Sequence, residues 1–117
     1  MKDIFAQGDL LIERVSDVPI TGTVLSAGDD GAVVLAEGEM TGHRHAIFER
    51  VTMFRDDGLA RDIPGGLYVG HVKVEDATAL IQHDEHAPIE LPRGTWRVRR
   101  QREMEPRLLA VLSHVFD

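Results

Sequence analysis

Turn signals containing glycine recur along this chain and leave only short apolar runs between them. Runs of this length, rich in β-branched residues and bounded by Gly, Pro, Asp or Ser, are typical of β-strands. They lie at 9–15, 23–26, 32–36, 67–74, 77–81 and 94–99. We therefore predict a mainly β protein with a single domain over residues 1–117, built of seven to nine short strands as a small barrel or sandwich.

The positions of Gly, Pro and Asp also predict two of the connections between strands. The link 27–31 is rich in Gly and Asp and stands between two β-branched runs, which predicts a hairpin joining 23–26 to 32–36. Residues 59–66 end in Pro64-Gly65-Gly66, which is unsuited to a central strand and predicts an excursion from the sheet.

Two segments have apolar residues at helical spacing. For 43–54 we favour a strand, because glycine spacing on both sides is of the β type. Residues 107–116 could form a short C-terminal helix opened by Pro106, a buried final strand, or a tail that contacts another subunit.

Composition narrows the classes of function. The 117 residues include no cysteine, which excludes disulfides, thiolate metal sites and cysteine nucleophiles. Twenty acidic residues against thirteen Lys and Arg give a net charge of −7, which disfavours binding to nucleic acid. No run approaches the ~20 apolar residues that cross a bilayer, and no signal peptide is evident, so we expect a cytoplasmic protein without membrane contact.

Four of the six histidines form two close pairs, His43 with His45 and His83 with His86. On a strand, His43 and His45 point to the same side about 6–7 Å apart, so both can reach one ion. The second pair is three residues apart, and a turn before Pro88 would bring its rings together. We predict that the two pairs share one divalent metal ion (Zn, Fe, Mn or Ni), which needs three or four N/O ligands.

Nearby carboxylates could complete or serve this site. Asp84, Glu85 or Glu49 could fill a coordination position or orient a ring. In an enzyme acting on a small oxygenated substrate, Glu85 is the candidate general base. Histidines that are merely solvated, that form a core network, or that line a metal-free site remain the alternatives. His71 and His114 stand alone, and only His71 has a pocket-lining alternative.

Thr41-Gly42-His43-Arg44-His45, followed by Glu49, resembles the first motif of the cupin family, and Leu91-Pro92-Arg93-Gly94 resembles the Pro-x-Gly turn of its second. The resemblance implies a small β-barrel with a divalent metal in its mouth, bound by His43, His45 and Glu49. Arg97 stands where the family has a further histidine, and His83 or His86 would substitute for it. The T-G-H-x-H and H-x-E-H patterns also resemble a group of uncharacterised small bacterial proteins, which implies no activity.

Six basic residues fall between positions 93 and 107: Arg93, Arg97, Arg99, Arg100, Arg102 and Arg107. They predict an edge strand protected by charge, or pairing with the many carboxylates. A site for a small-molecule anion or a subunit contact is the sharper alternative. The same basic strand, the apolar tail and the scarcity of catalytic residues support a second hypothesis, a non-enzymatic homo-oligomeric module that builds a ring, a shell or a layer on a particle.

Overall fold

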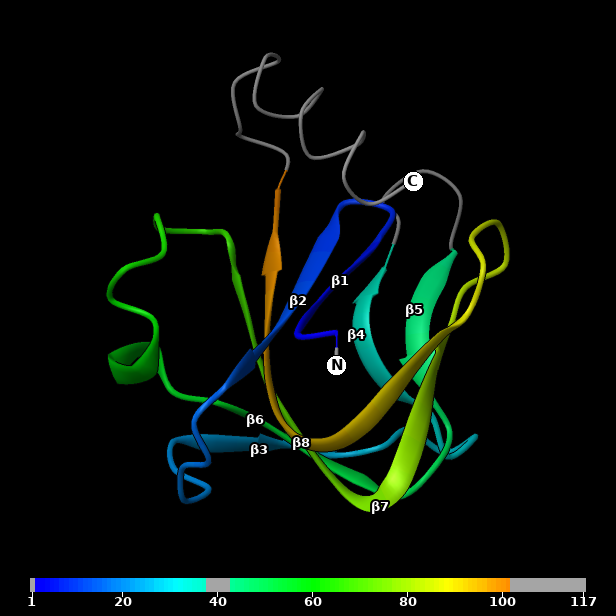
Figure 1. The fold of residues 1–117 in the computed structure, drawn as a ribbon, viewed down its shortest axis with the longest axis horizontal. Coiled ribbons are helices and arrows are strands. Elements are labelled where there is room, and N and C mark those ends of the chain that lie inside the picture. The colour runs from blue at the N-terminus through cyan, green and yellow to red at the C-terminus, as the bar shows by residue number, and fades with distance from the viewer. Residues whose placement is uncertain (1, 38–42, 102–117) are drawn as a thin grey trace.

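The computed structural model describes residues 2–37 and 43–101, which form one antiparallel β-sheet (Figure 1). Eight strands lie in this part of the chain, within the predicted range, and they confirm a mainly β fold. The strands are β1 (Ile4–Gln7), β2 (Leu10–Val15), β3 (Thr23–Leu25), β4 (Val33–Glu37), β5 (Arg44–Ile47), β6 (Val51–Arg55), β7 (Tyr68–Gln82) and β8 (Ile89–Arg100). A 3-10 turn, η1 (Asp57–Leu59), opens the connection between β6 and β7, which leaves the sheet over the predicted excursion 59–66.

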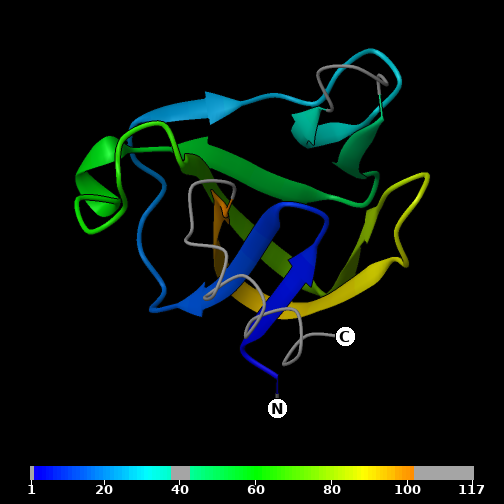
Figure 2. The ribbon, with the colours of Figure 1, turned by 90° about the horizontal axis from the view of Figure 1, so that it is seen from above.

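The sheet runs in the order β1-β2-β8-β7-β5-β4, and β6 also pairs with β7 and carries β3. It does not close by backbone pairing, since β1 and β4 are the two ends of this path. Figure 2 shows the sheet curled so that β3 and β6 lie opposite β1 and β2. The fold is therefore an open, curled sheet rather than a closed barrel.

The curl comes from the bend shared by the two longest strands, β7 and β8 (Figure 1). Their register shifts between Val74 and Thr78, where a β-bulge increases the local twist. Opposite it, Gly94 has a φ of +145°, and a Cβ there would lie 2.2 Å from Nη1 of Arg14. The Pro-x-Gly segment predicted as a turn is thus a bend inside β8.

The predicted hairpin across 27–31 is wrong. Gly28 N donates to the carbonyl of Ala32 at 2.9 Å, so the turn exists, but the strands on either side of it find different partners. β3 pairs with β6, while β4 pairs with β5. The cause is burial: Val33 and Leu35 of β4 enter the main core, whereas β3 is mostly exposed.

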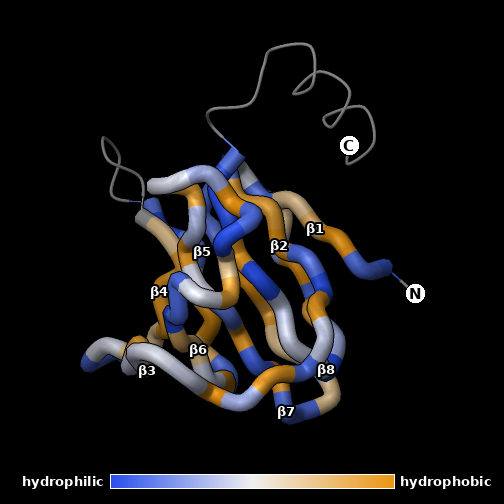
Figure 3. Tube along the Cα trace, turned by 90° about the vertical axis from the view of Figure 1, so that its left-hand side faces the viewer, coloured by the Kyte–Doolittle hydropathy of each residue, from blue (hydrophilic) through white to orange (hydrophobic). Residues whose placement is uncertain are grey.

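The main core lies inside the curl, where Trp96 is fully buried among aliphatic residues of β2, β4, β5, β7 and β8. Apolar and polar residues alternate along much of the trace in Figure 3, as expected for strands with one buried face. A smaller cluster of Ala60, Ile63, Leu67 and Tyr68 holds the excursion.

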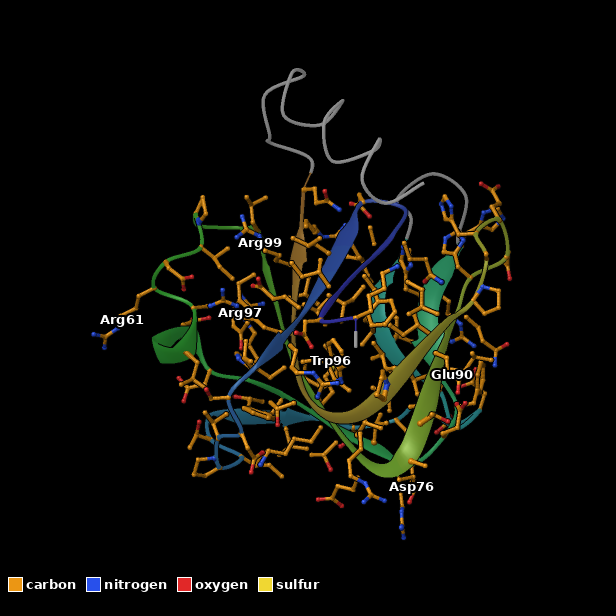
Figure 4. All side chains as sticks on the ribbon, in the orientation of Figure 1. Arg61, Asp76, Glu90, Trp96, Arg97 and Arg99 are labelled. Carbon is orange, nitrogen blue, oxygen red and sulfur yellow. The ribbon has the colours of Figure 1, made fainter. Side chains whose placement is uncertain are left out.

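The basic strand is not an edge strand, because β8 lies between β2 and β7. Charge here neutralises neighbouring carboxylates rather than protecting an edge. Arg97 and Arg99 lie on the side of the excursion, whereas Glu90 lies towards the opposite side of the sheet (Figure 4). Arg102, Arg107 and the apolar segment 107–116 lie outside the described residues.

The segment 43–54 is extended, as favoured, although residues 48–50 divide it into β5 and β6. No helix among the described residues is long and apolar enough to cross a bilayer.

Candidate functional site

The pairing of β5 with β7 brings the first histidine pair to the second. Ala46 pairs with Gln82 and Ile47 with Ile81. Continued by one residue, this register sets His45 opposite His83, and their ring centroids are 4.4 Å apart. The contact is thus the ordinary contact of cross-strand neighbours on one face.

The turn between β7 and β8 then adds the fourth histidine. Residues 83–88 lie between these strands, and the rings of His83 and His86 lie 4.6 Å apart between centroids. His86 is also stacked on His45 at 6.4 Å. The predicted convergence of the two histidine pairs is therefore present, with three ring centroids within 6.4 Å of one another.

His43 lies at the margin of this group. Its ring centroid is 5.8 Å from that of His83, and its Nδ1 lies 2.9 Å from Oε1 of Glu85. Asp84 is more distant, with 3.9 Å between its Oδ2 and Nε2 of His43. Both carboxylates are largely exposed. Of the two, only Glu85 is within hydrogen-bond distance of His43.

Gln7 of β1 fixes the proton positions of His45. The Gln7 amide nitrogen donates to the carbonyls of Ile81 at 3.1 Å and Ala87 at 2.9 Å, so its Oε1 can only accept. Nδ1 of His45 lies 2.8 Å from this oxygen and must be the donor. In the neutral ring Nε2 then carries the lone pair, the form in which a histidine binds metal.

His45 is buried, with only 5% of its surface exposed. This burial and, next, the neighbouring His83 lower the pKa of His45 to about 4. At neutral pH the ring is therefore uncharged, and protons do not compete with a metal for its Nε2.

The other rings are not aligned as ligands in the structure. Nδ1 of His83 accepts a 3.0 Å hydrogen bond from the backbone N–H of Glu85, which leaves the proton on Nε2 of the neutral ring. Among the described side chains, no group of three or more His, Asp or Glu residues meets the geometry needed to hold a metal ion as the rings stand. The rings thus lie close together, but their nitrogen lone pairs do not point to one common position.

Sequence reasoning missed the β1–β2 turn, which covers the histidines. Gly8, with φ +59°, is the first of its two residues, a position that favours glycine. A Cβ on Gly8 would lie 3.1 Å from Cε1 of His45 and 3.1 Å from Nε2 of His86. Asp9 follows, with its Oδ1 4.0 Å from Nε2 of His45 and its Oδ2 3.0 Å from Nη1 of Arg100. The dipeptide Gly8-Asp9 was a sequence signal for this turn.

A family model described as a domain of unknown function (DUF8820) matches residues 6–101. The chain belongs to the DUF8820 family. No curated protein and no solved structure is significantly similar to it. The DUF8820 match contains the β1–β2 turn, β5 and the 83–88 turn, so every part of the histidine group lies within the family domain.

In this DUF8820 chain the cupin-like Glu49 has a different partner. Its Oε1 accepts a 3.0 Å hydrogen bond from the backbone N–H of Leu80, and its Oε2 is buried with no hydrogen-bond partner among the described residues. Arg97, which stands where cupins have a histidine, binds Glu13 at 2.7 Å and Asp62 at 2.8 Å. Neither residue joins the histidine group through these contacts.

A second polar network of the DUF8820 domain surrounds His71, which is buried and stacked on Phe54. The hydroxyl of Tyr68 accepts from the backbone N–H of Asp56 at 3.2 Å, and it lies 2.7 Å from Nδ1 of His71. The hydroxyl and the His71 ring are therefore hydrogen-bonded to each other inside the fold. Burial, followed by the charge of Arg97, lowers the pKa of His71. His71 is thus a buried histidine of the core whose ring nitrogen Nδ1 has a hydrogen-bond partner.

Proposed function

We propose that this protein binds one divalent metal ion through His45, His83 and His86, with His43 beside them. The observation that carries the proposal is the bond between Gln7 and His45. It presents the Nε2 lone pair of a buried, neutral imidazole in a group of three rings. A second residue that orients a ligating histidine in this way is a regular feature of metal sites.

The ring spacing suits a shared ion. Two imidazoles on one tetrahedral ion have centroids about 5 Å apart, since each metal–nitrogen bond is about 2.1 Å. The observed separations are 4.4, 4.6 and 6.4 Å. Small movements of the rings would equalise them.

Ring rotation is the main step that binding requires. Turning His83 breaks its bond to Glu85 N–H, an exposed hydrogen bond worth roughly 1 kcal/mol. Structural zinc ions contribute roughly 10–16 kcal/mol in zinc-finger peptides, whose ligands include thiolates, and even a small part of that gain would offset the lost bond. The gain from the metal therefore exceeds the cost of rearranging the ring.

Donor chemistry limits the ion. Imidazole and carboxylate donors without thiolate suit Zn, Fe, Mn or Ni, whereas all-oxygen sites are preferred by Ca and Mg. If an open coordination position holds water, Glu85 is the residue available as a general base, because it is exposed and adjacent to His43. Whether the ion serves catalysis or binding alone depends on that open position.

The test is elemental analysis of the protein after chelation and reloading with Zn²⁺. One equivalent per chain is expected. His45→Ala should remove it, and His83→Ala and His86→Ala should each lower affinity by 100-fold or more. Glu49→Gln is the control, because it tests the cupin-like ligand set and should leave affinity unchanged. The proposal is contradicted if wild-type protein cannot be reloaded with Zn²⁺. It is also contradicted if the His45→Ala variant keeps its ion.

A further inference from the structure

The β1–β2 turn, which covers the histidine rings, carries a carboxylate close to the lone pair of His45. Oδ1 of Asp9 lies 4.0 Å from Nε2 of His45. We propose that Asp9 is a ligand of the metal ion and that Arg100 is the residue that positions it. This inference rests on the proposed function and adds an anionic ligand to its histidines.

The separation of these two atoms is close to that of two ligands on one ion. An imidazole nitrogen and a carboxylate oxygen, each about 2.1 Å from a metal, lie about 3.0–3.4 Å apart. An inward movement of less than about 1 Å would bring Asp9 from 4.0 Å to this distance. Asp84, by comparison, lies 3.9 Å from His43, the ring at the margin, and is 74% exposed.

Arg100 leaves one oxygen of Asp9 free for the ion. Its Nη1 binds Oδ2 at 3.0 Å, so the other oxygen, Oδ1, faces His45. The Arg100 side chain is only 23% exposed and comes from β8, the neighbour of β2. Ligating carboxylates are commonly held by a hydrogen bond of this kind.

The backbone of the turn is held in place as well. The N–H of Gln101 donates to the carbonyl of Asp9 at 2.9 Å, and the Gln101 amide donates to the carbonyl of Leu10 at 3.2 Å. Gly8 packs directly on His45 and His86, so the turn cannot move away without uncovering both rings. Gln7, Gly8 and Asp9 thus act as one wall of the site: the first orients a ring, the second covers two, and the third ligates.

This ligand set neutralises only one of the two positive charges of a zinc ion. Three imidazoles and one carboxylate leave a Zn²⁺ site with a net charge of +1, and in a tetrahedral ion they fill all four positions. Six-coordinate Fe²⁺, Mn²⁺ or Ni²⁺ would keep two positions for water or substrate. The inference therefore assigns a closed, non-catalytic site to zinc and an open one to the other ions.

The experiment compares Zn²⁺ affinity, measured by competition with a chromophoric chelator, in wild type, Asp9→Asn and Arg100→Gln. Asp9→Asn should weaken binding by about 100-fold or more, and Arg100→Gln by about 10-fold, the smaller loss expected of a positioning residue. Asp3→Asn is the matched control, because Asp3 also pairs with an arginine, Arg14 at 3.0 Å, at the other end of the same hairpin. Its affinity should stay within about 2-fold.

Equal affinity in Asp9→Asn and Asp3→Asn overturns the inference while wild-type binding upholds the proposed function. Absence of zinc binding in wild type overturns both. If Asp9→Asn does not fold, infrared difference spectra of wild type with and without Zn²⁺ decide. A shifted carboxylate stretch that also changes in Arg100→Gln supports Asp9 as ligand, and an unshifted band overturns it.

Discussion

Gln7 of β1 and His45 of β5 are joined by a 2.8 Å hydrogen bond between Oε1 and Nδ1, although backbone pairing does not close the sheet between their strands. β1 is one end of the sheet, and β5 is next to the other. The side chain of Gln7 therefore links one end of the sheet to the strand beside the other end, and the histidine site lies at this link.

Gln7→Leu should destabilise the metal-free protein by about 2–4 kcal/mol, because it leaves His45 and the carbonyls of Ile81 and Ala87 without their partner. Urea unfolding measures the change. Gln82→Leu is the control, since Gln82 is exposed in β7 and should shift stability by less than about 0.5 kcal/mol. Similar losses for the two variants would show that the Gln7 network is not structurally important.

Gly8→Ala should lower both stability and metal affinity. The left-handed φ of +59° costs an alanine roughly 1–2 kcal/mol, and the new Cβ presses on His45 and His86 at 3.1 Å. Gly31→Ala isolates the first effect, because Gly31 has a φ of +82° and nothing within 4 Å of a Cβ. Zinc titration of both should show weaker binding for Gly8→Ala only, and unchanged binding in Gly8→Ala would refute the packing argument.

Local patterns in the sequence predicted most strands, the excursion and the turn that brings His83 to His86. These depend on glycine, proline and alternation over a few residues. The predicted hairpin between β3 and β4 was wrong because burial of Val33 and Leu35 decided the pairing of β4. The register that sets His45 opposite His83 joins strands far apart in the chain, and no local pattern specifies it.

The contributions of Gln7, Asp9 and Arg100 were missed for the same reason. Gln7 reaches Ala87 across 80 positions, and Asp9 reaches Arg100 across 91. The pairing of Arg97 and Arg100 with carboxylates was expected from their abundance, but which carboxylates they bind follows from β8 being a central strand.

Stability of the metal-free protein should fall as the pH is lowered from about 6.5 to about 4. The pKa of His45 is about 4 in the folded state and 6.5 in the reference state, so the unfolded chain binds the proton first. A shift of this size corresponds to about 3 kcal/mol. The stabilisation is fully present above the unfolded pKa of 6.5. It is lost progressively as the pH falls towards the folded pKa of about 4.

His45→Asn separates this contribution from that of His71, whose pKa is also lowered. Asparagine can still donate to Gln7 but does not titrate in this range. In the presence of a chelator, unfolding at pH 7 and at pH 4.5 should differ less in this variant than in wild type. An identical pH dependence would show that the neutral form of His45 contributes nothing.

Tyr68→Phe should destabilise the fold by about 1–3 kcal/mol, because it leaves His71 Nδ1 and the N–H of Asp56 without a partner in a buried network. Thermal unfolding measures this loss. Zinc affinity should remain that of wild type, since the Tyr68 network is built on Asp56, His71 and Phe54 rather than on the four clustered histidines. A parallel loss of zinc binding would mean that the two networks are coupled.

The most direct test of the account is a crystal structure of the zinc-loaded protein with data recorded on both sides of the zinc absorption edge. We expect one anomalous peak about 2.1 Å from Nε2 of His45, in contact with His83 and His86, with Nδ1 still bonded to Gln7. A structure at full zinc loading with no peak among these rings, or with the peak elsewhere on the surface, would contradict it.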